Sequence, residues 1–299
     1  MFRNKIFFSA AGYYNRSTDQ LLSNQLPTMT GFPSYLANLP AVVVNKGLEF
    51  ELNTVNFHTE KFKWRTNVNI TFPKAFLKSY PDLDKSPYAN QFVIGQPLDN
   101  IMVLLFKGIN PGTGEAEFYD VNNDGIIDPL RGSYNNKNGD KVIVGQFSPK
   151  WYAGIFNSIT FKRFEADIAF QYINQEGYNL NSFYSSAGKT RNIWTEFLPY
   201  WSLSNKNSRN PAPSTVYSPP LSNYTASDRI ISSSSFLRLK TLFISYKFLV
   251  KEETLQVYLQ GQNLLTFSGY KGYDPETSAN AVLMIPPLKT INIGVKVIL

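Results

Sequence analysis

The feature that most constrains the fold is a period of two in the apolar residues, clearest in two neighbouring runs near the C-terminal end. The runs place apolar residues at Leu242, Ile244, Tyr246 and Phe248, and then at Leu255, Val257, Leu259 and Gly261. Such alternation indicates β-strands with one apolar and one polar face. The short charged link Lys251-Glu252-Glu253 joins them, so we predict an antiparallel hairpin. Each run has about 10 residues, enough to cross a bilayer as a tilted strand.

The same pattern is compatible with a soluble β-sandwich, which also has one apolar face. The two alternatives differ in what the polar face carries. A soluble sheet exposes many charges, whereas a membrane barrel turns its apolar face to lipid and keeps amides and hydroxyls in a wet lumen. Here the polar face is mostly Gln and Ser. This stretch favours the membrane barrel without excluding the sandwich.

Composition is aromatic-rich and poor in charge. Aromatic residues make up 15% of the 299 residues and charged residues 17%, against about 25% charged in an average protein. Girdles of aromatic side chains at the two membrane interfaces would account for this excess. No apolar run approaches about 18 residues, so no transmembrane helix is predicted. There is no Cys, which rules out disulfides and thiolate metal sites. The start, MFRNKIFFSAAG, resembles a signal peptide with too short an apolar core, and we expect any export signal to lie upstream.

Further alternating segments predict about ten strands, an even number that would bring both chain ends to one side of the sheet. The clearest is 62–72, and others lie at 5–15, 46–57, 164–172 and 288–299. We also expect a hairpin from 101–109 and 116–121, a long strand region at 142–161, and a loop at 76–95. Short links at 58–60, 162–163 and 249–253 alternate with long loops, above all 17–41 and 176–234. Short turns on one side and long loops on the other are typical of an outer-membrane barrel, with the long loops outside the cell.

One acidic segment is a candidate metal site. Asp120, Asn122, Asp124, Gly125 and Asp128 form the first half of an EF-hand-type calcium loop, with a Gly for the sharp turn. Arg131 stands where the bidentate Glu of such a loop belongs. Asp140 could supply that carboxylate if the 129–139 segment folds back. The alternative is an Asx-rich turn that binds no ion.

Other candidates are weaker. The aromatic residues Trp194, Tyr200, Trp201 and Tyr217 in the long loop suit either stacking on sugar rings or packing of the loop. The same-face acids Glu49 with Glu51, and Glu165 with Asp167, are more typical of a wet surface than of glycosidase chemistry. His58 is the only His, so no His-based triad can form. Basic residues are scattered despite a net charge of +7, which argues against nucleic acid and suits an anionic lipid surface.

Several motifs resemble one family. The run GQNLLTFSGYKGYDPE (261–276), preceded by SDRIISSSSFLRLKTLFISYKF (227–248), resembles the C-terminal signature of SusC/RagA-type TonB-dependent outer-membrane transporters. NKGLEFEL (45–52), VIGQPLDNI (93–101) and DVNNDGIID (120–128) with DKVIVGQFSPKWYAGI (140–155) are similar to further family segments, in order along the chain. The chain departs from the pattern at Arg131, in the longer segment 129–139, and at the final Leu299, where an aromatic is usual.

The resemblance implies an all-β fold, an antiparallel transmembrane β-barrel of which this chain supplies about ten C-terminal strands across 1–299, with no plug domain. It implies TonB-dependent import of an oligosaccharide or peptide across the outer membrane of a Gram-negative, Bacteroidetes-like bacterium, and no enzymatic activity. The expected partners are a SusD-like surface lipoprotein, TonB through sequence upstream, and outer-membrane lipid. Glu49, Glu51, Asn67 and Asn69 are expected to face the lumen. A passive porin-like barrel and a secreted β-rich sugar-binding protein are the alternatives.

Overall fold

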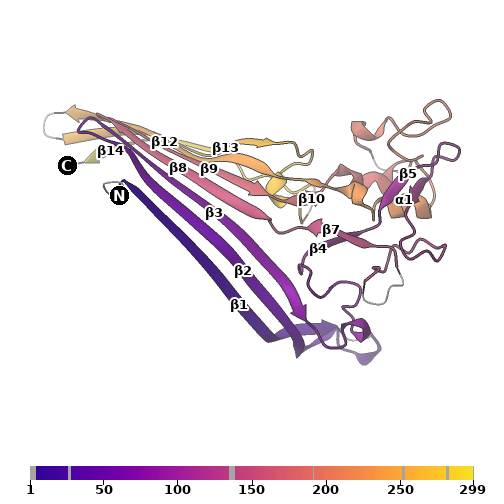
Figure 1. The fold of residues 1–299 in the computed structure, drawn as a ribbon. Helices are drawn as coiled ribbons and strands as arrows, with labels where there is room; N and C mark the ends of the chain where they lie inside the picture. Colours follow the sequence, from indigo (N-terminus) through magenta and orange to yellow (C-terminus); the bar gives the residue numbers. More distant parts are fainter. Residues whose placement is uncertain are drawn as a thin grey trace.

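A computed structural model describes residues 5–25, 28–134, 139–190, 192–250, 253–280 and 283–298 of the chain. Its main element is one antiparallel sheet of eight strands, which we call the strand wall (Figure 1). The strands neighbour one another in chain order, so each is joined to the next as a hairpin or by a long connection. They are β1 (Ile6–Gln25), β2 (Ser34–His58), β3 (Phe62–Ser79), β8 (Trp151–Phe161), β9 (Phe164–Asn174), β12 (Phe236–Val250), β13 (Glu253–Ser268) and β14 (Thr290–Ile298).

Six short strands pair outside the wall, in three two-stranded sheets. They are β4 (Asn100–Val103) with β7 (Val142–Gln146), β5 (Phe106–Ile109) with β6 (Ala116–Phe118), and β10 (Glu176–Tyr178) with β11 (Ile231–Ser233). The helical segments are α1 (Pro219–Tyr224) and the 3-10 turns η1 (Thr28–Thr30), η2 (Leu83–Lys85), η3 (Leu180–Ser186), η4 (Thr195–Phe197), η5 (Asp228–Ile230) and η6 (Pro275–Thr277). Within the described ranges, no helix is both long and apolar enough to cross a membrane.

The two ends of the wall differ as the loop lengths predict. Short turns join β2 to β3 and β8 to β9 at the end where both termini lie (Figure 1). The third short link, after β12, includes Lys251 and Glu252, which lie outside the described residues. All long connections gather at the other end, with β4, β5, β7, β10 and α1. An even number of wall strands thus brings both chain ends to one side.

Two prolines explain a wrong prediction. The segment 17–41 was expected to be a long loop, but β1 continues to Gln25 and β2 starts at Ser34. Pro40 lies in a β-bulge, because Thr18 pairs with Val42 whereas Gln20 pairs with Leu39. A proline at a bulge removes no ladder hydrogen bond. Likewise β3 continues past Pro73 into the predicted 76–95 loop. Pairing of β3 with β8 stops at Thr71, so Pro73 lies where β3 has a neighbour on one side only, and a proline is tolerated there.

The predicted number of strands was also too high for the wall. Within the predicted hairpin of 101–109 and 116–121, only β5 and β6 pair, apart from the wall, whereas 101–103 lies in β4 and pairs with β7. The 142–161 region splits into β7, which pairs with β4, and β8, which joins the wall. The wall is an open sheet with β1 and β14 as its edges in the described part of the chain, so it does not close into a barrel.

Register gives the wall two chemically opposite faces. One cross-strand row joins seven apolar residues: Phe8, Leu52, Val68, Ile155, Phe170, Leu239 and Leu265. The row beside it, on the other face, joins Ser9, Glu51, Asn69, Gly154, Gln171, Arg238 and Thr266. Neighbouring residues of a strand point to opposite faces, so the wall has an apolar face and a polar face along its length.

Candidate functional site

The polar face carries the residues that the sequence predicts to face a lumen. Asn67 Nδ2 donates to Glu51 Oε1 at 2.9 Å and to Asn53 Oδ1 at 2.6 Å, and Asn53 Nδ2 also donates to Glu51 at 2.9 Å. Asn69 is the cross-strand partner of Glu51, and Glu49 lies two residues along β2. The four predicted residues therefore share one face, and an amide network holds the Glu51 carboxylate.

A second polar cluster lies on the same face across β9, β12 and β13. The Glu165 carboxylate accepts from Lys247 Nζ at 2.5 Å, from Ser245 Oγ at 3.3 Å and from Gln256 Nε2 at 3.3 Å. Ser245 and Gln256 are buried although both are polar. Glu165 thus has a structural ion pair, which accounts for it without glycosidase chemistry.

The long connections fold into a compact unit, the loop cap, made from residues 104–118 and 178–230. Its core is aromatic: Tyr184 and Tyr224 are fully buried, and Phe197 is 2% exposed. The Tyr184 ring meets Phe197 at 4.9 Å and Tyr224 at 5.2 Å between centroids, both edge-on. Tyr184 Oη donates to the Pro211 carbonyl at 2.7 Å, and burial raises the pKa of this phenol. The cap is therefore an ordered body and not a set of loose loops.

The four aromatic residues proposed for substrate stacking are dispersed over the cap. Trp194 packs edge-on against Tyr273 at 6.3 Å. Trp201 covers Gly114, where an added Cβ would lie 2.3 Å from the indole, and its Nε1 donates to the Pro111 carbonyl. Tyr200 and Tyr217 are 36% and 76% exposed. No two of these four described rings contact each other, so the structure does not assemble them into one platform.

A cavity of about 270 Å³ lies where the cap meets the wall. Its lining is polar at Asn179, Asn181, Ser233 and Lys271 and apolar at Phe197. The Asn181 and Asn179 amides both donate to the Arg229 carbonyl, at 2.8 and 3.0 Å. The cavity is thus a mostly polar recess between the cap, β11 and the segment that follows β13.

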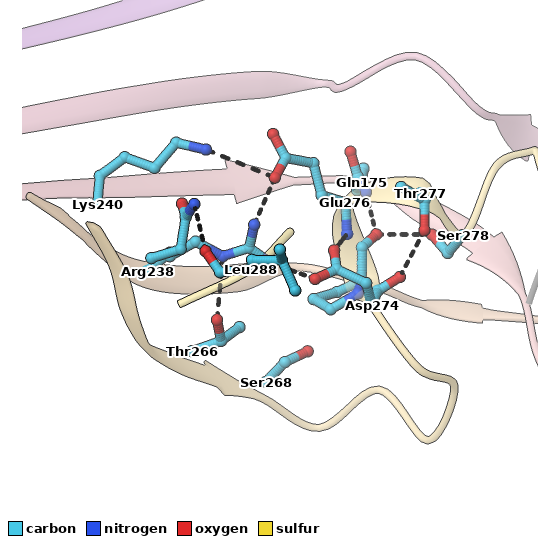
Figure 2. A network of polar contacts seen from close by, with 12 residues as sticks. Gln175, Arg238, Lys240, Thr266, Ser268, Asp274, Glu276, Thr277, Ser278 and Leu288 are labelled. Carbon is cyan, nitrogen blue, oxygen red and sulfur yellow. Dashed lines mark hydrogen bonds and ion pairs between the residues drawn. The ribbon is translucent and has the colours of Figure 1, made fainter. Parts of the chain in front are cut away.

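A buried ion network, which sequence reasoning missed, fastens the segment 274–278 to the polar face (Figure 2). Arg238, 1% exposed, donates to Asp274 at 2.7 Å and to Glu276 at 2.5 Å. Its Nε also donates to Thr266 Oγ1 at 3.0 Å, and its guanidinium lies 4.8 Å from the centre of the Phe236 ring. Gln175 and Ser278 both donate to the Pro275 carbonyl. The only sequence signal was a cation and two acids near opposite ends of the 235–276 stretch.

The acidic loop at 120–128 is closed by its own backbone. Asp120 accepts from the Gly125 N–H at 2.8 Å, and Gly125 has a φ of 83° as the sharp turn requires. Asp140 does lie against this loop: its buried carboxylate accepts from the Val121 and Asp128 N–H groups, both at 2.7 Å. Within the described residues, no three acidic or His side chains converge as metal ligands. Residues 135–138 lie outside the described part.

Two basic side chains lie near the negative charge of this loop. Arg131 Nε lies 3.6 Å from the Asp128 carboxylate. Burial lowers the pKa of Lys141, and the nearby Asp128 carboxylate opposes that shift. The geometry as folded is therefore that of a hydrogen-bonded Asx loop, and calcium binding stays a prediction.

Comparison with known proteins places these features in context. No family model matches the chain. TonB-dependent receptors P26 and P3 of Formosa agariphila are each 28% identical to it over 93% of its length. TonB-dependent receptor SusC of Bacteroides thetaiotaomicron is 24% identical over 90%. The chain spans only 30%, 29% and 27% of these three relatives.

Solved structures agree on the fold. A chain of the RagAB peptide transporter superposes with a TM-score of 0.76 at 22% identity, over 99% of this chain and 34% of that one. The RagAB peptide importer in its closed-closed state gives 0.77 at 22% identity, with the same coverage. The resemblance to TonB-dependent receptors of the SusC and RagAB kind, drawn from the motifs, is thereby confirmed, and the chain corresponds to about a third of such a protein.

Proposed function

We propose that this chain forms a C-terminal part of an outer-membrane barrel that imports a nutrient with energy delivered by TonB. The observation that carries the proposal is the pair of neighbouring rows on the wall, one apolar and one polar across seven strands. The apolar face is exposed, for example at Phe8 (66%) and Ile293 (78%). An apolar face of this extent, without a second layer over it in the described part of the chain, suits contact with lipid.

The dimensions and the distribution of aromatics support the membrane assignment. On the apolar face of β3, Trp64 and Phe72 flank Thr66, Val68 and Ile70. Eight residue steps of about 3.3 Å give roughly 26 Å along the strand, which a strand tilt of about 40° reduces to roughly 20 Å across the membrane, most of the apolar band of about 25 Å. Aromatic pairs mark both ends of this band: Phe57 with Trp64 at 6.0 Å, and Trp151 with Tyr172 at 4.7 Å.

Polar side chains on the apolar face satisfy one another, as lipid exposure requires. Asn157 Oδ1 accepts from Trp64 Nε1 at 3.0 Å and from Thr66 Oγ1 at 2.7 Å. Thr66 in turn accepts from Asn56 at 2.7 Å. These groups lie close to the short-turn end, beside the aromatic residues there.

In this proposal the polar face, with Glu49, Glu51, Asn67 and Asn69, contacts a plug supplied by upstream sequence or the passing solute. The short-turn end is periplasmic and the loop cap is extracellular. A SusD-like surface lipoprotein would cover the cap, and Trp194, Tyr200, Trp201 and Tyr217 would contact an oligosaccharide or a peptide. TonB would act through the upstream region.

A calcium ion in the acidic loop is a separate part of the proposal. Asp120, Asn122, Asp124 and Asp128 would hold it after some backbone N–H bonds to their side chains are released. Calcium should then raise the melting temperature of the complete protein, and Asp124→Ala should remove that rise. A melting temperature unaffected by calcium would rule the ion out.

The membrane assignment is tested with single cysteines, since the chain has none of its own. Ile70→Cys and Asn69→Cys are neighbours on opposite faces. In the complete protein reconstituted in bilayers, a fluorophore at position 70 should be quenched by lipid-attached nitroxides, and one at position 69 should not. Equal quenching at both sites would refute the barrel.

Transport is tested separately in the native bacterium. Uptake of the substrate pool, oligosaccharides or peptides, should fall when the gene is deleted and also when TonB is deleted. Uptake that depends on the gene but not on TonB would indicate a passive porin-like barrel.

A further inference from the structure

On the apolar face, cations replace apolar residues near the middle of β1 and β2 and towards the C-terminal end of β3. Leu48 and Phe72 are cross-strand partners, and the next row along joins Tyr14, Lys46 and Lys74. Arg16 follows on β1, opposite Val44. All three cations are exposed. We call Arg16, Lys46 and Lys74 the basic row.

Among the residues that the structure describes, the basic row has no ion-pair partner. Lys46 and Lys74 lie directly opposite each other, an arrangement that destabilises a sheet when both are charged. Among the described residues, no carboxylate forms an ion pair with Arg16, Lys46 or Lys74. The nearest acid on β2, Glu49, belongs to the polar face. An external anion at this position would remove the repulsion.

The two lysines converge on one ring. Lys46 Nζ lies 5.6 Å and Lys74 Nζ 5.9 Å from the centre of the Phe76 ring. Val44, the cross-strand partner of Phe76, is fully buried. The side chains therefore fold together into a local cationic site and do not extend separately into solvent.

A groove of about 510 Å³ continues from this site onto the apolar band. Lys46, Lys74 and Tyr14 line its upper part, and Gly12, Leu48 and Phe72 its lower part. Gly12 leaves room there: an added Cβ would lie 3.5 Å from the Leu48 side chain. A cationic rim above an apolar floor matches an anion that carries a hydrocarbon chain.

We propose that the basic row binds the phosphate of an anionic lipid in the outer leaflet, with an acyl chain in the groove along Leu48 and Phe72. The proposal rests on the membrane orientation argued above. At the level where the apolar band ends, a lipid phosphate meets the two ammonium groups, and the Tyr14 hydroxyl is placed to donate a further hydrogen bond. Free phosphate would use only the rim and would leave the groove without a role.

The test uses the complete protein in phosphatidylcholine nanodiscs that contain a small fraction of a fluorescent, diphosphorylated acyl-glucosamine lipid. Lys46→Gln with Lys74→Gln should weaken its retention roughly thirtyfold, since each lysine near an anionic surface contributes about a fivefold factor in affinity and the two factors multiply. Gly12→Leu, which fills the groove and keeps the charges, should also weaken it. The matched control is Lys61→Gln with Lys162→Gln at the short-turn end, where Lys162 likewise lies over a ring, Phe161, at 5.5 Å.

The outcomes separate the lipid from its alternatives. Retention that is unchanged in the Lys46/Lys74 double variant, or equal for the dephosphorylated lipid, would overturn the proposal. Displacement of the lipid by millimolar inorganic phosphate, with Gly12→Leu silent, would instead assign a free phosphate site and refute the acyl contact. If a fluorophore at Leu48→Cys is not quenched by lipid nitroxides, the membrane orientation itself fails, which is a different result from loss of phosphate binding alone.

Discussion

The strand wall and the loop cap orient their aromatic side chains in opposite directions. In the cap, Tyr184, Tyr224 and Phe197 point inward and are at most 2% exposed. On the wall, Phe8 and Phe72 point outward and are 66% and 41% exposed. The wall is held by backbone ladders between strands, whereas the cap is held by side-chain packing. One chain thus contains a water-excluded core next to a sheet that needs an apolar solvent.

The difference shows that burial within this chain is a poor guide to which apolar residues contribute to the stability of the folded protein. A conventional reading would treat the exposed wall residues as free to change and the cap residues as critical. In a membrane, both sets are removed from water, but by lipid in one case and by protein in the other. The two regions should therefore respond differently to the same substitution.

The largest effect is expected from Phe197→Ala in the cap, compared with Phe72→Ala on the wall. Removing a fully packed phenyl ring leaves a cavity and costs about 3–5 kcal/mol. Lipid can fill the space left at Phe72, so we expect about 1 kcal/mol or less there. Limited proteolysis of the cap and heat-modifiability of the barrel on gels, in the complete protein, measure the two regions separately. Equal loss in both variants would mean that the wall packs against protein at Phe72.

The junction between the two regions gives the next effect. Arg238→Met leaves Asp274 buried at 5% exposure without its partner, which should cost about 3 kcal/mol. We place the loss at the lower end because Glu276 is 34% exposed and can be hydrated. The expected result is release of the 269–278 segment, seen as faster amide exchange.

Lys240→Met is the matched control for Arg238→Met, because Lys240 lies two residues further along β12. Lys240 also reaches Glu276, at 3.6 Å, but is 37% exposed. A pair so exposed contributes about 0–1 kcal/mol. If Lys240→Met released the segment as fully as Arg238→Met, the buried pair with Asp274 would not be what holds it.

Sequence alone predicted the wall well because its signal is local. Alternation determines which residues share a face, and the register agrees: Ile244 pairs with Leu259 and Glu51 with Asn69. The prediction was wrong where a residue type is common in two kinds of local structure. Pro40 signals a loop in general but lies in a bulge here. The pairing of β4 with β7 could not be predicted, since a short apolar run carries no information on its partner.

The site was less predictable because its contacts are long-range. Arg238 and Asp274 are 36 residues apart, and their pairing depends on how the segment after β13 folds over the polar face. The basic row had a readable signal that was overlooked: Lys46 and Lys74 occupy the apolar phase of strands that otherwise carry Leu48 and Phe72 there. Asp140 was predicted to supply a calcium ligand, and in the described structure its carboxylate binds backbone N–H groups.

A charge placed on either face of β3 sharpens the comparison inside the wall. Ile70→Arg puts a guanidinium in the middle of the apolar band and should cost about 2–3 kcal/mol of folding free energy in lipid. Asn69→Arg, one residue earlier, points to the polar face beside Gly154 and should cost well under 1 kcal/mol. Urea titration of the complete protein refolded into vesicles measures both. A larger penalty at 69 than at 70 would reverse the assignment of the faces.

The smallest expected effect is a pH dependence of the free energy of unfolding that arises from Tyr270, in the segment after β13. Tyr270 Oη donates to the Tyr178 carbonyl at 2.6 Å. Burial, with a contribution from the Asp274 carboxylate, raises the pKa of Tyr270 from 10.0 to about 12. The folded state therefore keeps this proton to higher pH than the unfolded chain does. The free energy of unfolding should fall as pH rises from 10 towards 12 and be unaffected by Tyr270 below pH 10.

Tyr270→Phe keeps the ring and removes the ionisable hydroxyl, so it should flatten the pH dependence in that window at the cost of one hydrogen bond. Tyr273→Phe is the control, because Tyr273 lies in the same segment and is 55% exposed. The effect is expected to be small because Tyr270 is only part-buried and solvent screens its charge. Ultraviolet titration of phenolate formation, followed in both variants, isolates the Tyr270 contribution. A pH dependence that survives in Tyr270→Phe but disappears in Tyr273→Phe would show that the segment after β13 packs with the other ring inward.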